Sequence, residues 1–288
     1  MARKRSGILV ILCIMLLFVF LACHETKAIG QQKQVFSVAG QKTVGYTEML
    51  DALAHSQVVF IGESHDNQAH HQMQLDVIKA LHGSGAPLAV GFEMFTAKNQ
   101  AILDAWVAGG ISQEEFIKVY YDNWNFPWPL YRDILMYVRD NKIPAVGLNI
   151  EPAISRKVAQ SGFSSLTKEE IEKLPPDIGC SVDKQYMDFI RRAHAMHGHE
   201  NKNFLFFCQA QILWDQVMAR NIVNYLQKNP GKTVVVIAGR GHAWKRGIPE
   251  QIRLLAGNIK YKVILPFIPG HIESRFITTG DADYLLPP

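Results

Sequence analysis

Five polar side chains follow short apolar segments of this chain and are candidates for one shared site. The apolar segments begin at Val58, Leu88, Pro144 and Thr233, and the polar residues at their ends are Glu63, His65, Glu93, Asn149 and His242. Carboxylate and imidazole groups hold divalent metals, and they also pass protons to and from a reacting water. Glu63, His65, Glu93 and His242 are therefore the candidate catalytic and metal-ligating residues.

The segments that carry these residues have the pattern of buried strands. Continuous apolar runs of this length, each followed by a helical pattern, are typical of strands covered on both faces of a parallel sheet. A fifth run, Tyr261 to Pro266, has no polar ending. Because ligands bind outside the carboxyl ends of such strands, the polar residues should converge there. We predict an α/β fold with a mostly parallel sheet flanked by helices.

The polar residues also have a purely structural interpretation. Glu63 and His65 point the same way on an extended chain, and an isolated pair of this kind more often caps the next helix or bonds to neighbouring loops. Glu93 favours a site, because a carboxylate at the end of a buried strand needs a cation, a proton or several donors. The aromatic segment Trp124 to Tyr131 could form a wall for a flat ligand, but such segments more often staple a connection to the core.

The stretch 152–227 breaks the alternation of strands and helices. It is predicted to be a smaller helical insertion, a lid or a dimer face, between the two parts of the α/β domain at 43–151 and 228–288. The run Phe204 to Cys208 could be a strand instead. Within the insertion, Met187, His194 and His197 follow helical spacing and could share a face as iron ligands, although a histidine-rich helix end is more often exposed to solvent.

The first residues predict export. Three basic residues, Arg3 to Arg5, precede an apolar run from Ile8 to Ala22, which has about the length of a signal peptide and is short for a spanning helix. The run closes on Phe20-Leu21-Ala22-Cys23, which resembles a bacterial lipobox. Residues 1–22 would then be a signal peptide, Cys23 the lipidation site, and 23–42 a lipid-anchored linker with an edge strand near Val35. Cleavage after Ala28 and an uncleaved anchor are the alternatives.

Charge and cysteine usage narrow the function classes. The formal charge of +4 includes three basic residues of the signal, and no basic run occurs elsewhere. Nucleic acid is therefore excluded as a predicted partner. Cys180 and Cys208 are the cysteines beyond the lipobox, and an exported setting allows either a disulfide between them or two buried thiols.

A series of motifs runs in order along the chain from about Val58 to Pro266. It comprises Gly62-Glu63-Ser64-His65-Asp66, Gly91-Phe92-Glu93-Met94-Phe95, Trp128-Pro129-Leu130-Tyr131-Arg132, Ile143 to Asn149, Gln209 to Ala219 with Trp214-Asp215, and Ala238-Gly239-Arg240-Gly241-His242. Together these motifs resemble the ChaN family of bacterial haem-binding lipoproteins. The resemblance implies haem as the cofactor, a role in haem or iron acquisition at the cell envelope, and a haem-linked homodimer. Tyr186 is the first candidate for the iron ligand and His194 the second, with Met187 and His197 beside them.

The same resemblance also implies a function of another class. The ChaN family shares a superfamily with Tiki-type metalloproteases and erythromycin esterases, and Glu63, His65, Glu93 and His242 occupy the positions of the residues that support hydrolysis there. A bound divalent metal would lower the pKa of a water at such a site. A haem-binding lipoprotein without enzymatic activity is the leading hypothesis. A metal-dependent hydrolase or protease is the alternative, and a scaffold with a structural polar network is the third.

Overall fold

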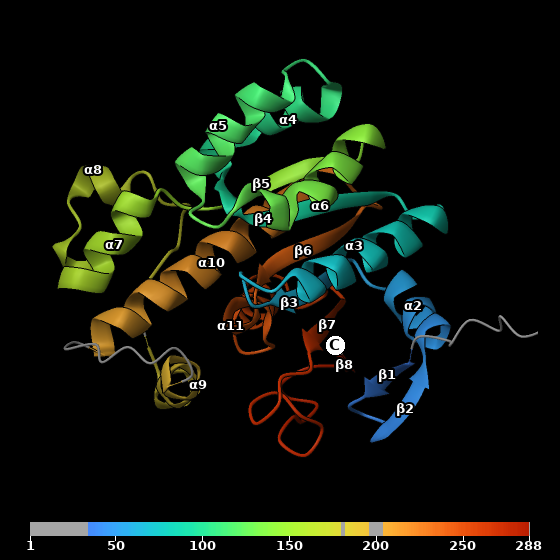
Figure 1. The fold of residues 1–288 in the computed structure, drawn as a ribbon. Coiled ribbons are helices and arrows are strands. Elements are labelled where there is room, and N and C mark those ends of the chain that lie inside the picture. Colours follow the sequence, from blue (N-terminus) through green and yellow to red (C-terminus); the bar gives the residue numbers. More distant parts are fainter. Residues whose placement is uncertain (1–33, 180–181, 196–203, 288) are drawn as a thin grey trace, which may run out of the picture. The chain divides into compact units, whose positions relative to one another are not determined.

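One eight-stranded sheet organises the chain (Figure 1). The computed structural model describes residues 34–179, 182–195 and 204–287. In spatial order the strands are β2 (Lys42–Gly45), β1 (Gln34–Ser37), β8 (Tyr284–Leu286), β7 (Tyr261–Pro266), β3 (Val58–Glu63), β6 (Thr233–Gly239), β4 (Leu88–Thr96) and β5 (Ala145–Asn149). Pairing is parallel from β8 to β5, whereas β1 pairs antiparallel with both β2 and β8. The predicted α/β fold with a mostly parallel sheet is confirmed.

The register of the central strands brings two site segments together. Every residue of β3 and β4 is buried, as expected for strands covered on both faces. Strand β3 pairs with β6 from Val58 opposite Val234 to Glu63 opposite Gly239. The ends of these two strands therefore lie side by side at the carboxyl edge of the sheet.

Helices cover both faces of the sheet (Figure 1). Val59 and Ile61 belong to a core shared with α2 (Tyr46–Ala54), α3 (Gln68–Gly83), α4 (Gln100–Ala108), α5 (Gln113–Asn123) and α6 (Trp128–Asp140). Val58 and Phe60 point to the other face and pack with α10 (Phe204–Lys228), α11 (Arg240–Ala243) and α12 (Ile248–Leu255). The period of two in the strands thus separates two cores.

Helix α3 starts directly after the loop that follows β3. Asn67 is its N-cap, and the Oδ1 atom accepts hydrogen bonds from the backbone N–H groups of Ala69 at 2.9 Å and His70 at 3.2 Å. An Asn side chain in this position satisfies donors that have no partner within the helix. The cap fixes the start of the helix and so places His70 and His71 in its first turn, beside the strand edge.

Between β5 and β6 the described chain forms only helices. These are α7 (Pro152–Ser161), the short η3 (Phe163–Ser165), α8 (Lys168–Ile171), α9 (Lys184–Ala195) and α10. Another short helix, η2 (Ala97–Asn99), lies earlier in the chain, directly after β4. The run Phe204 to Cys208 is the start of α10 and not a strand. Helix α10 packs on the sheet and also against α7 and α9, so it belongs both to the α/β core and to the helical segment between β5 and β6. The boundaries of a separate insertion domain stay a prediction.

Several predictions concern the N-terminal part of the chain. The predicted signal peptide, the lipidation site Cys23 and most of the linker lie outside the described residues. Strand β1 lies in the predicted linker near Val35, where an edge strand was expected, but it pairs with both β2 and β8, so β2 is the edge strand on this side of the sheet. Among the described helices, none has both the length and the apolar character required to cross a bilayer. Cys208 is a buried free thiol, and Cys180 lies outside the described residues.

Candidate functional site

A cleft opens at the carboxyl ends of β3, β4, β5 and β6. Its volume is about 580 Å³, within the range of about 300–1,000 Å³ typical of ligand pockets. The five polar residues predicted to converge all line it. The full lining consists of Glu63, Ser64, His65, Asp66, Glu93, Trp124, Phe126, Asn149, Ile190, Phe207, Gln211, Trp214, Gly239, Arg240, Gly241 and His242.

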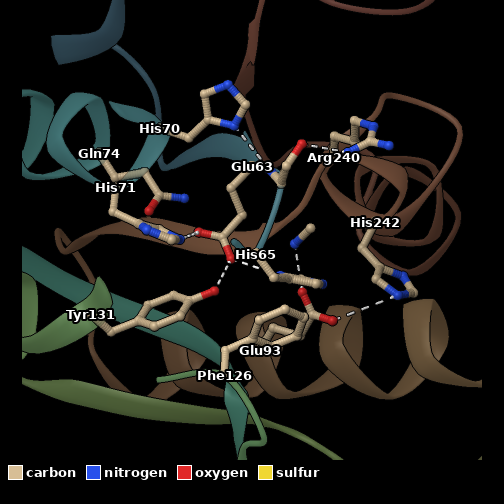
Figure 2. A network of polar contacts seen from close by, with 12 residues as sticks. Glu63, His65, His70, His71, Gln74, Glu93, Phe126, Tyr131, Arg240 and His242 are labelled. Carbon is tan, nitrogen blue, oxygen red and sulfur yellow. Dashed lines mark hydrogen bonds and ion pairs between the residues drawn. The ribbon is translucent and has the colours of Figure 1, made fainter. Parts of the chain in front are cut away.

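Glu63 is the buried centre of the polar network at the base of this cleft (Figure 2). Its Oε1 atom accepts hydrogen bonds from His65 Nδ1 at 2.8 Å and from the Tyr131 hydroxyl. Its Oε2 atom lies 3.1 Å from Nε2 of the buried His71, without the alignment of a hydrogen bond. Burial alone would raise the pKa of Glu63, but the contacts with His65 and His71 hold that pKa well below its usual range.

His65 connects the buried carboxylate to the open cleft. Its side chain is 28% exposed, and its ring packs against Trp124 and Phe126 with centroids 5.0 Å away in both cases. Burial lowers the pKa of His65, but the bond to Glu63 and the charge of Glu93 outweigh it and raise the pKa. Because Glu63 takes Nδ1, Nε2 is the ring nitrogen left to meet a ligand.

Glu93 is held by one backbone donor and one side-chain donor, each from an adjacent strand. Its Oε2 atom accepts a 2.6 Å hydrogen bond from the N–H of Gly239 at the end of β6. The Asn149 amide at the end of β5 donates to the backbone oxygen of Glu93 at 2.8 Å. The bond from Gly239 fixes the carboxylate and the bond from Asn149 fixes the backbone at the sheet edge. There the Oε1 atom of Glu93 lies 3.7 Å from Nε2 of His242.

His242 forms a second pair of imidazole and carboxylate, with Asp215 of α10. The distance from His242 Nδ1 to Asp215 Oδ1 is 2.7 Å, and Asp215 is 1% exposed. Burial alone would lower the pKa of His242, but the charges of Asp215 and Glu93 raise it to about 9. Asp215 belongs to one of the sequence motifs, but that motif alone predicts no role for it. The sequence carries one signal for it, an acidic residue among the apolar residues of a helix segment that faces the core.

Two further polar residues line the cleft: Ser64 in the loop before α3 and Arg240 at the start of α11. Arg240 Nη1 donates to Ser64 Oγ at 2.6 Å, so the guanidinium group is held at the cleft wall. The N–H of Ser64 donates to His70 Nδ1 at 3.0 Å, which requires that nitrogen to be unprotonated. Burial lowers the pKa of His70 to about 4, in keeping with this bond.

The predicted iron ligands lie on or after α9. The Tyr186 hydroxyl donates to Asp215 Oδ2 at 2.8 Å and the residue is 7% exposed. Met187 is partly buried beside Tyr186 in the small core between α9 and α10. His194 belongs to the last turn of α9. His197 lies outside the described residues. Neither Tyr186 nor Met187 lines the large cleft, where α9 contributes Ile190. The assignment of the iron ligand stays a prediction.

The aromatic segment Trp124 to Tyr131 contributes both to the wall of the cleft and to the core. Trp124 and Phe126 line the cleft, whereas Trp128 is buried in the core, where its ring meets those of Phe116 and Tyr120 edge to face. The Tyr120 hydroxyl donates to the backbone oxygen of Phe126 at 2.8 Å and so anchors the cleft wall to the core.

A divalent metal finds no support in this arrangement. Within the described ranges, no group of three His, Cys, Asp or Glu residues has the geometry to hold a metal ion. Of the predicted ligands, Glu63 and His65 are bonded to each other. Glu93 accepts a hydrogen bond from the N–H of Gly239, and His242 is bonded to Asp215.

Comparison with known proteins gives a family match over most of the chain. The model of the family described as "Haem-binding uptake, Tiki superfamily, ChaN" matches residues 49–252. Among solved structures, the chain is similar to ChaN of Campylobacter jejuni, whose structure is described as showing cofacial haem binding. The two are 22% identical with a TM-score of 0.69, over 89% of this chain and 97% of that chain. This likeness supports the fold.

Two more distant similarities were found. An erythromycin esterase, EreC, in its open conformation is 13% identical with a TM-score of 0.49, over 82% of this chain and 76% of that chain. The chloroplastic protein RETICULATA-RELATED 5 of Arabidopsis thaliana is 21% identical over an alignment of 207 residues, which covers 67% of this chain. The chain spans only 28% of the length of that plant protein.

Proposed function

Because the chain belongs to the ChaN family of haem-binding uptake proteins in the Tiki superfamily, we propose that it binds haem in the cleft at the sheet edge. One observation supports this location: aromatic and aliphatic side chains surround the partly exposed imidazole of His65, whose Nδ1 atom is bonded to Glu63. A porphyrin needs flat apolar walls, a ligand for its iron and a partner for its carboxylates.

The cleft offers groups for each of these needs. Trp124 and Phe126 come from the segment before α6, and Phe207 and Trp214 come from α10, so apolar walls are supplied by two separate elements. Arg240 is the guanidinium group at the wall, and arginine binds carboxylates through paired donors. The cleft residues therefore fit the chemistry of haem.

The iron ligand is proposed among two sets of residues. The sequence points to Tyr186, His194, Met187 and His197. The geometry adds His65, because a metal-binding imidazole commonly donates its other N–H to a carboxylate, as His65 Nδ1 does to Glu63. Tyr186 would first have to release its hydrogen bond to Asp215.

Haem titration of the purified protein tests the function. We expect a saturable shift of the Soret band, with a changed spectrum in the variant that lacks the iron ligand. His65→Gln is compared with His82→Gln, because His82 also bonds through Nδ1, to the Tyr137 hydroxyl at 3.0 Å, but does not line the cleft. His194→Ala and Tyr186→Phe test the ligands proposed from the sequence. Absence of saturable binding would overturn the function.

We further propose that the protein works in haem or iron acquisition at the cell envelope, attached through a lipid on Cys23 and facing the periplasm or the exterior. The lipobox-like sequence supports the anchor. Fractionation of cells with the protein and with Cys23→Ser should move the variant from the membrane to the soluble fraction. A haem-linked homodimer is tested by sedimentation with and without haem, where haem should double the mass.

Hydrolysis is a second candidate, favoured by the presence of two imidazole and carboxylate pairs in one cleft. His65 is bonded to Glu63 and His242 to Asp215, and such a partner orients an imidazole for general acid–base catalysis, with the raised pKa of His242 favouring the role of the acid. Glu93 lies beside His242 at the same edge. A panel of ester and peptide substrates, assayed with and without a chelator, tests this activity. Turnover that is lost in both His65→Gln and His242→Gln, but kept in His82→Gln, would establish it.

A further inference from the structure

A continuous chain of polar contacts leads from the cleft into the helical layer. Glu93 Oε1 lies 3.7 Å from His242 Nε2, His242 Nδ1 lies 2.7 Å from Asp215 Oδ1, and Asp215 Oδ2 accepts the Tyr186 hydroxyl at 2.8 Å. The four residues come from β4, α11, α10 and α9. Two of them line the cleft and the other two do not.

The carboxylate of Asp215, in the middle of this series of contacts, is shielded from water, and this burial raises its pKa. Asp215 is 1% exposed, and a carboxylate at such a place is costly unless donors surround it. Both of its oxygens are used: one by the imidazole of His242 and one by the phenol of Tyr186. The position of the carboxylate is therefore determined from two sides.

This arrangement settles the orientation of the His242 ring. An imidazole that donates from Nδ1 to a fixed carboxylate cannot turn over without breaking a charge-assisted hydrogen bond. The edge-to-face contact with Trp214, at a centroid distance of 5.7 Å, restricts the same ring. Nε2 is consequently the nitrogen presented to Glu93 and to the cleft.

We propose that Asp215 is a positioning residue for His242, holding the ring with Nε2 turned toward the cleft, and that the Tyr186 hydroxyl serves to fix Asp215. Among the candidates for the iron ligand, Tyr186 is thereby given a positioning role instead, through its hydrogen bond to Asp215. The proposal concerns the same cleft as the proposed function, but it holds whichever ligand the cleft binds. It assigns roles to Asp215 and Tyr186, the two residues of this series of contacts that do not line the cleft.

Proton NMR of the haem-free protein tests this arrangement. An imidazole Nδ1–H bonded to a buried carboxylate gives a low-field resonance, and the one from His242 is identified by its loss in His242→Gln. We expect this resonance to be absent in Asp215→Asn. In Tyr186→Phe we expect it to remain and to exchange with water about tenfold faster, because one bond that holds Asp215 is lost.

Two controls keep the test specific. The resonance of His65 Nδ1–H, bonded to Glu63, should persist unchanged in both variants. Tyr137→Phe removes the hydroxyl that is bonded to the ring of His82, and neither residue lines the cleft. This variant should leave the His242 resonance unchanged. If the His242 Nδ1–H resonance kept its position in Asp215→Asn, the proposed role of Asp215 would be wrong. If that variant does not fold, unchanged exchange in Tyr186→Phe overturns the proposal by itself.

Haem titration of Tyr186→Phe separates this proposal from the proposed function. We expect the haem spectrum of the variant to match that of the unmodified protein, because the phenol has a positioning role. A lost or shifted iron-ligand signature in Tyr186→Phe would overturn that role. Failure of the unmodified protein to bind haem would overturn the proposed function alone, since the NMR experiment contains no haem.

Discussion

Gly239 and His65 lie so close together that no side chain fits at position 239. A Cβ atom built there would stand 2.8 Å from Cε1 and 3.0 Å from Nε2 of the imidazole. The N–H of the same glycine donates to Glu93 at 2.6 Å. One glycine at the end of β6 therefore allows an imidazole from the loop after β3 and a carboxylate from β4 to share the cleft.

Gly239→Ala should displace the His65 ring and weaken haem binding. Overpacking of a buried position of this kind costs about 1–3 kcal/mol, and here the imidazole must move or the strands must separate. Gly83→Ala, at the end of α3, is the control, because a Cβ there would meet nothing within 4 Å and Gly83 does not line the cleft. Urea unfolding and haem titration of both variants check this. Equal stability and equal affinity in the two would show that the close approach has no consequence.

Tyr131→Phe should destabilise the protein more than Tyr120→Phe. Both hydroxyls lie on fully buried side chains, but Tyr131 donates to the Glu63 carboxylate and Tyr120 donates to a backbone carbonyl. Hydrogen bonds to charged groups contribute about 1.5–3 kcal/mol and those between neutral groups about 0.5–1.5 kcal/mol. The free energies of unfolding in urea provide the comparison. The reverse order would mean that Glu63 is neutral in the folded protein.

The free energy of unfolding should fall on the alkaline side because of His242. Burial lowers its pKa, but Asp215 and Glu93 raise it from 6.5 to about 9 in the folded protein. A raised folded pKa contributes stability that is fully present below about pH 6.5 and is lost as the pH rises through about 9. The contribution is at most ~3 kcal/mol.

The difference in unfolding free energy between the unmodified protein and His242→Gln isolates this contribution. Measured at several pH values from 6 upward, the difference should shrink as the pH approaches 9.5, a value chosen to lie roughly half a unit above the folded pKa. A difference that stays constant over this range would show that His242 does not carry a charge that depends on folding.

Phe126→Leu and Trp128→Leu should separate the two roles of the aromatic segment. Phe126 lines the cleft and is partly exposed, so its loss should weaken haem binding with little change in stability. Trp128 is 6% exposed in the core, and its truncation should cost roughly 2–4 kcal/mol, somewhat less than replacement by Ala. Haem titration and urea unfolding measure the two effects. Loss of affinity in Trp128→Leu without loss of stability would contradict this division.

The elements that position the cleft could be predicted because they depend on local pattern. The apolar run from Val58 is long enough for a strand buried on both faces, and the structure makes β3 of it. The rule that parallel strands end at one edge then brings Glu63, Glu93 and His242 together, and all three line the cleft. The haem family could be predicted because several short motifs keep their order along the chain.

The partners behind the cleft wall could not be predicted, because they depend on how distant elements face one another. Tyr131 reaches Glu63 across 68 positions, and this contact depends on the rotation of α6. Asp215 reaches His242 across 27 positions, from the interior of a helix whose neighbouring residues are apolar. Helical spacing identifies a face, but it does not tell which polar residue on that face finds a partner. Tyr186 was predicted to bind iron, and only the folded arrangement reveals its contact with Asp215.

The position of β6 between β3 and β4 has a consequence for how the protein is made. A ribosome produces β3 and β4 long before β6, yet these two strands do not pair with each other and meet only through the later strand. Until residues 233–239 emerge, both strands carry unpaired backbone groups along their edges. The nascent chain therefore needs to be kept from pairing with other chains, and the cleft comes into being only at the end of synthesis. A fragment that stops before β6 would leave the two strands open to aggregation and would have no cleft.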